Sequence, residues 1–378
     1  MMKRGIALAA VVAVVLTGCG SDGKQKEEKT VVVQQQEKQY VEDTIAVLPE
    51  EDMYEEELLL TTDLQTNQEG EPALYQFIEE TDDTGDEFAA VVEYSLNSDG
   101  NWKTKNIGRK DIQKRVKNEM QHNLAFPFIQ RGDDGNLYVL VKCFDDEDYG
   151  MGADPSEKAY CAYSVMAIDE EKDECHEIKL QTKAVDDQGE EIDYAREFDV
   201  TNFHVMEDGT FFLVFSGASA LWFDGTTGTQ TNVCTSIPDS AFGKSVAYGE
   251  NGILYFSSSS KIFGILDSDS LEVVSNFGKD MPEENRKYDW RFDTDTTTWE
   301  TYAFNPSGLY RISDFGKKAS AQLLSSRGNF DSLADANIYD ILVGAKEELY
   351  VLVRLPQQDE DGEAGLYQFG IIKYQAES

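Results

Sequence analysis

The chain has 378 residues, 72 of them acidic and 33 basic, which gives a formal net charge of −39 at pH 7. A surface this acidic repels nucleic acid and anionic lipid headgroups, because both are bound through basic side chains, so we expect no nucleic-acid partner. The hydrophobic content of 40% is enough for one large packed domain or two smaller ones.

The first 18 residues have the plan of an export signal. Lys3 and Arg4 precede an apolar run from Ile6 to Leu16, which is too short for a membrane-spanning helix of about 20 residues. The run ends in Leu16-Thr17-Gly18-Cys19, which resembles the lipobox of bacterial lipoproteins. The resemblance implies cleavage before Cys19 and a diacylglyceryl group on its thiol, so that lipid holds the chain on the extracytoplasmic face of a bacterial membrane. The alternative is an ordinary secretory signal with Cys19 beside its cleavage site.

Residues 19–42 are predicted to form a disordered tether. From Gly20 to about Glu42 the chain is mostly Gly, Ser, Asp, Lys, Gln and Glu, and its apolar stretch, Val31 to Val33, is too short to stay folded. We expect this segment to carry the folded domain, residues 43–378, clear of the lipid surface.

After the tether, short apolar segments alternate with turns rich in Asp, Gly, Asn and Ser, a pattern typical of an all-β fold. One segment type is an acidic-Gly turn followed by an aromatic and aliphatic strand: Asp133–Leu140, Glu207–Val214 and Glu250–Phe256, with Lys346–Leu352 lacking the glycine. A second hairpin type alternates with the first: Val92–Gly100, Met166–Lys172, Leu221–Gly228, Gly264–Ser270 and Leu309–Gly316. Two alternating hairpins make a four-stranded sheet, and such a sheet repeated every 40 to 50 residues or so predicts a β-propeller.

Six four-stranded blades are expected, near residues 54–107, 124–181, 199–236, 242–277, 287–325 and 335–374. The last unit lacks a fourth strand, and the N-terminal segment Thr44–Leu48 is expected to supply it, which closes the ring and removes two exposed sheet edges. Seven blades remain open if a degenerate blade lies in a long connection. A β-sandwich or jelly roll, which uses the same hairpins, is the alternative fold.

One short amphipathic helix is predicted over residues 109–121, because Ile112, Val116 and Met120 recur at a spacing of four. We expect it to pack on the propeller rim. Seven basic residues gather around it: Lys103, Lys105, Arg109, Lys110, Lys114, Arg115 and Lys117. We interpret them as a solvated face meeting acidic neighbours, and a contact site for an anionic partner is the alternative.

Four cysteines remain besides Cys19, and disulfides are chemically permitted in an exported protein. Cys143 and Cys161 lie on two predicted strands joined by an acidic loop, where an antiparallel hairpin could set them at bridging distance. Neither Cys175 nor Cys234 has such a counterpart.

No catalytic, cofactor or metal site is predicted. Gly217–Leu221 lacks the last glycine of a nucleophile elbow, and Gly150–Pro155 has proline where a dinucleotide fingerprint needs glycine. The three histidines, His122, His176 and His204, have no partners at zinc spacing. His204 is expected on an innermost strand, where its ring could face the central channel, and we favour a structural role over a general base.

Several acidic motifs resemble known sites only in part. The loops Asp145–Asp154 and Asp359–Gly362 lack calcium-loop spacing, and we interpret them as solvated. Asp293–Trp299 resembles the end of a sialidase Asp-box without its glycine, which we interpret as a hairpin with a buried tryptophan. Asp224–Gly228 resembles the D-x-x-T-G turn of quinoprotein-like repeats, but a single copy does not indicate a redox cofactor.

Taken whole, the chain resembles the uncharacterised lipid-anchored propeller proteins of bacterial envelopes, through Leu16–Cys19 and the acidic-Gly strand repeats. These motifs indicate location rather than activity. We favour a non-enzymatic, monomeric surface module for binding or scaffolding, held to the membrane by lipid alone, that recognises a peptide, glycan or partner protein through loops at one end of the ring. The alternative is a glycan hydrolase or lyase with carboxylates in the central channel.

Overall fold

The part of the chain that the structure describes is almost entirely β-strand. The structure is a computed structural model, and it describes residues 40–48, 63–81, 87–108, 110, 112–114, 123–132, 134–145, 160–172, 174–185, 189–216, 219–234, 246–248, 253–257, 263–267, 273–275, 290–295, 298–305, 308–313, 320–326, 330, 333, 337–344, 348–358 and 364–376. Residues 37–378 belong to one compact unit. No helix among the described residues is long and apolar enough to cross a membrane.

These residues form six four-stranded antiparallel sheets. The first sheet contains β2 (Gln65–Thr66), β3 (Pro72–Thr81), β4 (Glu87–Leu96) and β5 (Trp102–Ile107), and the second contains β6 (Asn123–Arg131), β7 (Leu137–Phe144), β8 (Cys161–Asp169) and β9 (Glu174–Lys179). The third contains β12 (Val200–Val205), β13 (Phe211–Phe215), β14 (Ser219–Phe223) and β15 (Gln230–Cys234), and the fourth contains β16 (Val246–Tyr248), β17 (Ile253–Ser257), β18 (Phe263–Asp267) and β19 (Val273–Ser275). The fifth contains β20 (Arg291–Asp295), β21 (Glu300–Asn305), β22 (Gly308–Ser313) and β23 (Ser320–Ser326), and the last contains β24 (Asn337–Gly344), β25 (Glu348–Gln358), β26 (Ala364–Ala376) and β1 (Tyr40–Val47). A small hairpin, β10 (Lys183–Val185) with β11 (Glu191–Asp193), and the short helix α3 (Tyr194–Glu197) connect the second sheet to the third.

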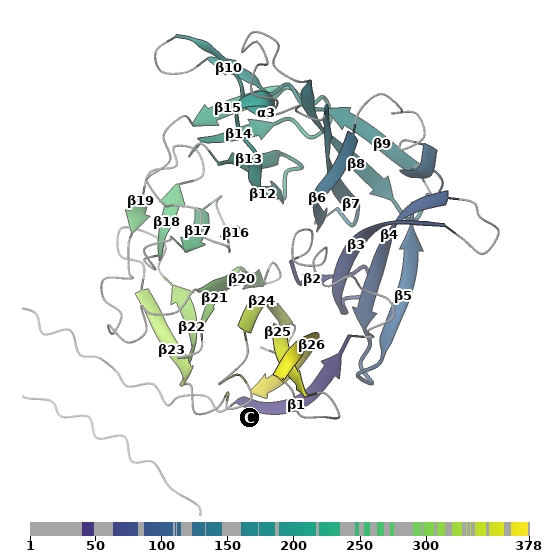
Figure 1. Ribbon diagram of the computed structural model, residues 1–378. Helices are drawn as coiled ribbons and strands as arrows, with labels where there is room; N and C mark the ends of the chain where they lie inside the picture. Colours follow the sequence, from purple (N-terminus) through teal and green to yellow (C-terminus); the bar gives the residue numbers. More distant parts are fainter. Residues whose placement is uncertain are drawn as a thin grey trace, which may run out of the picture. The chain divides into compact units, whose positions relative to one another are not determined.

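Sheets of this kind are arranged around a common axis, with β2, β6, β12, β20 and β24 as innermost strands (Figure 1). The innermost strands of neighbouring sheets contact one another, as β2 does with β6, β6 with β12, and β20 with β24. This arrangement is a β-propeller, and the sandwich and jelly-roll alternatives are wrong.

The last sheet takes its outer strand from the other end of the chain. β1 pairs antiparallel with β26, with Tyr40 opposite Ala376 and Val47 opposite Gly370. The strand begins at Tyr40, four residues before the segment expected to pair there. Tyr40 packs beside Phe330 at a ring distance of 5.9 Å, and Ala46 and Leu48 pack against the first sheet. The two ends of the domain are therefore joined by backbone pairing and by side-chain packing.

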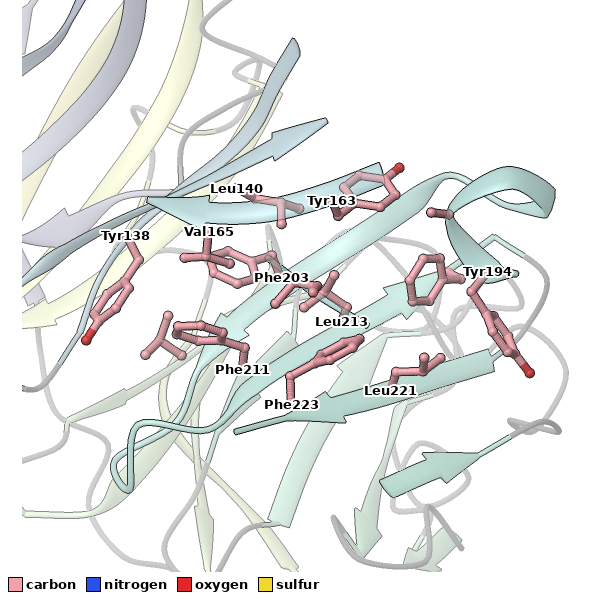
Figure 2. Close-up of a cluster of buried hydrophobic side chains, with 14 of the residues drawn as sticks. Tyr138, Leu140, Tyr163, Val165, Tyr194, Phe203, Phe211, Leu213, Leu221 and Phe223 are labelled. Carbon is pink, nitrogen blue, oxygen red and sulfur yellow. The ribbon is translucent and has the colours of Figure 1, made fainter. Parts of the chain in front are cut away.

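Apolar side chains fill the spaces between neighbouring sheets. Figure 2 shows the cluster between the second and third sheets, where Leu140 and Val165 meet Phe211, Leu213 and Phe223. All five residues of β13 and all five of β14 are buried, because middle strands are covered on both faces by adjacent sheets. Each such side chain contributes roughly 1.5–3 kcal/mol when fully buried.

The acidic-Gly turns place glycine where the backbone needs a left-handed residue. Gly70, Gly135 and Gly209 have φ of +80°, +82° and +81° in the first hairpins of the first three sheets. Such a conformation favours glycine because a Cβ is crowded there. In the fifth sheet Trp299, with φ +57°, takes that place, and its side chain is partly exposed. The hairpin predicted over Asp293–Trp299 is present, but the prediction of a buried tryptophan was wrong for Trp299.

The bridge that the sequence left possible between Cys143 and Cys161 is not formed. The two residues lie on a hairpin as expected, but the register sets Cys143 opposite Ala162 and Cys161 opposite Phe144. Because successive residues of a strand point to opposite faces, the two sulfur atoms lie on opposite faces of the sheet. A one-residue offset is therefore enough to prevent the bridge.

The predicted helix is described only at its start. Lys110 and residues 112–114 are helical, and the rest of 109–121 lies outside the described residues. Ile112 donates its amide hydrogen to the Gly108 carbonyl at 3.0 Å. Its side chain is fully buried among apolar residues of the first two sheets, so this turn is anchored in the core between them.

Candidate functional site

Polar side chains recur at one position of the innermost strands. Gln65, Gln130, His204 and Asp293 each lie two residues before the residue that closes the first hairpin of their sheet. All four residues are partly buried, and the polar atoms that they turn away from water need hydrogen-bonding partners inside the protein. The structure supplies those partners from the neighbouring innermost strand.

Gln65 and Gln130 bind the backbone of the next sheet. Gln65 on β2 donates through Nε2 to the Ile129 carbonyl at 2.8 Å and accepts the Arg131 amide hydrogen at 2.6 Å. Gln130 on β6 accepts the Val205 amide hydrogen at 2.8 Å. Each side-chain amide thus hydrogen-bonds the backbone of the neighbouring innermost strand, as a paired strand would. We call such a side-chain contact between two sheets a junction.

Carboxyl groups make the equivalent junctions at the last sheet. Asp293 Oδ2 on β20 accepts the Val343 amide hydrogen of β24 at 2.6 Å. Asp340 Oδ2 on β24 accepts the Leu64 amide hydrogen, beside β2, at 2.7 Å. Four junctions thus follow chain order from β2 to β6, β6 to β12, β20 to β24, and β24 back to the start of β2.

Arg291 reinforces the junction between β20 and β24. Its guanidinium donates to the Tyr339 carbonyl and, at 3.2 Å, to the Ile338 carbonyl. The residue is 6% exposed, so its charge is held by backbone oxygens away from bulk water. This positive charge also lies close enough to Asp63 to oppose the rise in the pKa of that carboxyl.

His204 lies on an innermost strand, as the sequence predicted, and it is held by Gln130. Because Gln130 Oε1 is occupied by a backbone N–H, its Nε2 points at His204 Nδ1, 3.0 Å away. An amide nitrogen only donates, so Nδ1 accepts and the ring proton sits on Nε2. Burial lowers the pKa of His204 to about 4, which keeps the ring neutral near pH 7. This is the environment of a structural histidine.

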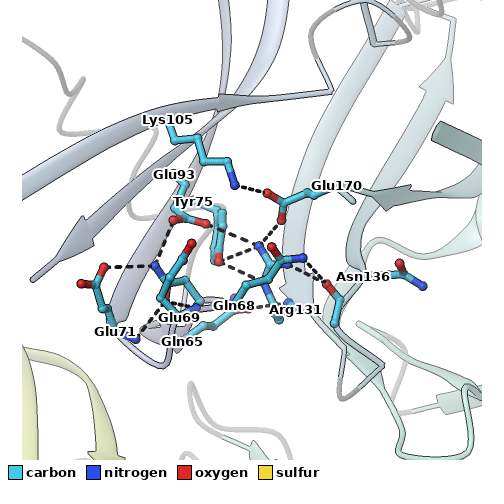
Figure 3. A network of polar contacts seen from close by, with 12 residues as sticks. Gln65, Gln68, Glu69, Glu71, Tyr75, Glu93, Lys105, Arg131, Asn136 and Glu170 are labelled. Carbon is cyan, nitrogen blue, oxygen red and sulfur yellow. Dashed lines mark hydrogen bonds and ion pairs between the residues drawn. The ribbon is translucent and has the colours of Figure 1, made fainter. Parts of the chain in front are cut away.

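A second polar group joins the first two sheets around Arg131 (Figure 3). The guanidinium contacts Glu170 Oε1 at 2.6 Å and Glu93 Oε2 at 3.4 Å, and donates to the Tyr75 hydroxyl at 3.0 Å. All three charged side chains are at most 8% exposed. One arginine therefore holds two buried carboxylates from different sheets.

The basic residues near the predicted helix are described in part. Lys103 pairs with Glu71 at 2.9 Å, and Lys105 pairs with Glu170 at 2.6 Å. Lys110 and Lys114 are exposed, whereas Arg109, Arg115 and Lys117 lie outside the described residues. The two described pairs agree with the interpretation of a charged face that meets acidic neighbours.

Other predicted features also lie outside the described residues. They are Cys19, His122, the loop from Asp146 to Ala159, and Asp359–Gly362. Among the residues that the structure does describe, no group of three His, Cys, Asp or Glu side chains is placed to hold a metal ion. Of the junction residues, Gln65, Gln130 and Asp340 were not named from the sequence, and Asp293 was named only as part of the segment Asp293–Trp299. The recurrence of Gln65, Gln130 and Asp293 two positions before a hairpin is a signal that could have identified them.

Comparisons with known proteins give structural likeness at low identity. No protein-family model matches the chain, and no curated protein matches it. Among solved structures, a chain of the mitotic checkpoint complex is 10% identical with a TM-score of 0.45, covering 95% of this chain and 98% of the other. The WD40 β-propeller domain of Doa1 is 9% identical with a TM-score of 0.37, covering 90% and 98%. BamB from Moraxella catarrhalis is 10% identical with a TM-score of 0.35, covering 89% and 99%.

Proposed function

We propose that this chain is a lipid-anchored propeller on the extracytoplasmic face of a bacterial membrane, and that it binds a peptide, glycan or partner protein. Anchoring is supported by the Leu16-Thr17-Gly18-Cys19 sequence behind an apolar run. In this proposal all six sheets are blades of one closed ring, with β1 as the outer strand of the last blade. The pairing of β1 with β26 and the bond from Leu64 to Asp340 support that closure.

The binding face that we propose is the end of the ring that carries the first hairpin of each sheet. Two of these turns touch, since Gln68 Nε2 donates to the Gly135 carbonyl at 3.3 Å. The tips carry exposed acidic side chains, such as Glu69, Asp134 and Asp208. Complementary charge steers association, so this face favours partners with basic groups.

The proposal of a binding module rests mainly on Trp299. It is a large aromatic residue in a left-handed backbone conformation at a hairpin tip, and it is partly exposed to solvent. That conformation costs a non-glycine residue about 1–3 kcal/mol, and such cost is concentrated at ligand sites. Tryptophan is also the residue type most enriched at binding hot spots.

The binding proposal is tested on peptide and glycan arrays probed with the purified chain and with Trp299→Ala. The matched control is Tyr160→Ala, since Tyr160 is 40% exposed but precedes β8, at the opposite end of its sheet. We expect a ligand whose signal drops at least tenfold with Trp299→Ala and is unchanged with Tyr160→Ala. An equal loss of array signal for both variants, or a ligand signal that does not change with Trp299→Ala, would contradict the proposed binding face.

The anchor is tested separately by mass spectrometry of the N-terminal peptide from bacterial membranes. We expect a diacylated peptide that begins at Cys19 and a Cys19→Ser variant that leaves the membrane fraction. An unmodified thiol in the wild-type chain would contradict anchoring without affecting the binding face.

A glycan hydrolase or lyase is the second candidate, and one observation favours it. Burial raises the pKa of Asp293 to about 7 and raises that of Asp340 well above its usual value, as a general acid requires. Against it, each carboxyl already accepts a backbone hydrogen bond. Turnover of a glycosidase substrate that disappears in both Asp293→Asn and Asp340→Asn would support this candidate.

A further inference from the structure

The four described junctions fall into two chemical kinds. Those from the first and second sheets use the amides of Gln65 and Gln130, which do not titrate. Those on either side of the last sheet use the carboxyls of Asp293 and Asp340. The ring is therefore held by groups that are indifferent to pH on one side and by titratable groups where its two ends meet.

The surroundings of the two carboxyl groups disfavour their charged forms. Burial has the largest effect on both, and it raises the pKa of Asp340 well above its usual value and that of Asp293 to about 7. The negative charges of Asp63 and Asp293 act on Asp340 in the same direction, and that of Asp295 acts on Asp293. Backbone hydrogen bonds from Leu64 and Val343 oppose the rise without cancelling it.

The nearby groups come from each element packed at this seam. Asp63 precedes β2, Asp293, Asp295 and Arg291 belong to β20, and Asp340 belongs to β24. Asp63 is exposed to solvent, although surrounding protein atoms raise the pKa of its carboxyl. In the proposal it acts only as a negative charge beside Asp340. The Arg291 charge is held by the β24 carbonyls, and it acts mainly on Asp63.

We propose that Asp293 and Asp340 make the seam around the last sheet a proton-sensitive closure. With both carboxyls protonated, each still accepts its backbone hydrogen bond through the carbonyl oxygen, and no charge is buried. When the protons pass to solvent, two negative charges lie on side chains that are only partly exposed, with the exposed Asp63 beside them. The repulsion and the lost solvation loosen β24 from β20 and from the start of β2.

Proton linkage gives the direction in which stability changes with pH. A carboxyl whose folded pKa is raised binds its proton more tightly in the folded state, so folding becomes less favourable as pH rises from the unfolded pKa, near 4, to the folded value. For Asp293 this window ends near pH 7.

Hydrogen exchange at pH 5 and pH 8, corrected for the intrinsic pH dependence of amide exchange, tests the proposal in the purified chain. Leu64 and Val343 report on the carboxyl junctions, and Arg131, whose junction through Gln65 does not include His204, reports on an amide junction in the same molecule. We expect protection at Leu64 and Val343 to fall about tenfold or more relative to Arg131, since one pKa unit corresponds to a factor of ten. An equal response at all three amides would overturn the proposal, and this comparison needs no variant.

Asparagine variants give the second measurement. Asp293→Asn and Asp340→Asn keep a carbonyl acceptor and remove the titrating proton, which imitates the glutamine junctions. Each should abolish the pH response at its own amide, whereas Asp199→Asn, which alters a carboxylate that is 76% exposed, should leave both responses unchanged. A response that persists in both variants would show that other groups titrate at the seam.

Discussion

Gln130 and His204 lie 74 positions apart in the chain, yet Nε2 of the first is 3.0 Å from Nδ1 of the second. The same amide accepts the Val205 N–H. One side chain thus fixes both the orientation of a neutral histidine and the spacing of two sheets.

Replacing Gln130 by alanine is expected to cost about 1–3 kcal/mol of unfolding free energy, because a buried N–H and a buried ring nitrogen lose their shared partner. Chemical denaturation measures this loss. Gln68→Ala is the control, since Gln68 is exposed and makes a single 3.3 Å bond, and it should cost less than about 0.5 kcal/mol. Similar losses for both variants would argue against the junction.

His204 should make the protein less stable in acid. Its folded pKa is lowered to about 4, so the unfolded state, with a pKa near 6.5, takes up the proton first as pH falls. Stability attributable to this residue is lost from about pH 6.5 down to pH 4, on the order of 2–3 kcal/mol in total. His204→Gln places glutamine at the position that Gln65 and Gln130 occupy in their sheets. This variant should not lose that stability in acid, so between pH 6.5 and pH 4 it should become more stable relative to wild type by the same amount. His176→Gln, whose side chain is 70% exposed, should show no such trend.

Arg131 should contribute far more to the free energy of unfolding than a surface ion pair does. Arg131→Met leaves Glu93 buried without a cation and leaves Glu170 with Lys105 alone, which is expected to cost about 3–5 kcal/mol. Lys103→Met breaks the exposed pair with Glu71 and should leave the free energy of unfolding nearly unchanged. Urea denaturation of both variants at one pH gives the comparison. A loss below 1 kcal/mol for Arg131→Met would mean that the network does not stabilise the first two sheets.

Gly228 should tolerate no side chain. Its φ is +68°, and an added Cβ would lie 2.0 Å from the Lys179 carbonyl oxygen, where the outer turn of the third sheet meets the second. Gly70 has φ +80° but no atom within 4 Å of such a Cβ. Gly70→Ala therefore measures backbone strain alone, about 1 kcal/mol, and Gly228→Ala should cost roughly 2 kcal/mol more. Equal melting temperatures for the two variants would contradict this packing.

The architecture could be predicted from the sequence because the repeated hairpins are local signals. Asp133–Leu140 and Glu207–Val214 each place a turn glycine before a strand that must be buried, and both fold in that way. The closing role of the N-terminal strand followed from counting strands in the last unit. The register of the strands could not be predicted, because the periodicity of a strand does not say which residue lies opposite which. The bridge that the sequence left possible between Cys143 and Cys161 is excluded by an offset of one position.

The candidate site could not be predicted in the same way. With 72 acidic residues, nothing in the sequence separates Asp293 and Asp340 from the rest. Their distinction is that their side chains are partly buried and accept hydrogen bonds from backbone amides at a neighbouring sheet, which are properties of the assembled ring. From the sequence, His204 was singled out because histidines are few, and Asp293 was named only as the start of the segment Asp293–Trp299.

The joining of the two ends of the domain by β1 and β26 is tested most directly by cysteine cross-linking. Val41 lies opposite Gln375 in the register, and both are exposed. We predict that Val41→Cys with Gln375→Cys forms a disulfide under mild oxidation, identified by peptide mapping. Val47→Cys with Gln375→Cys, six positions out of register on β1, should not. Failure of the first pair, or equal cross-linking of both, would contradict the closed ring.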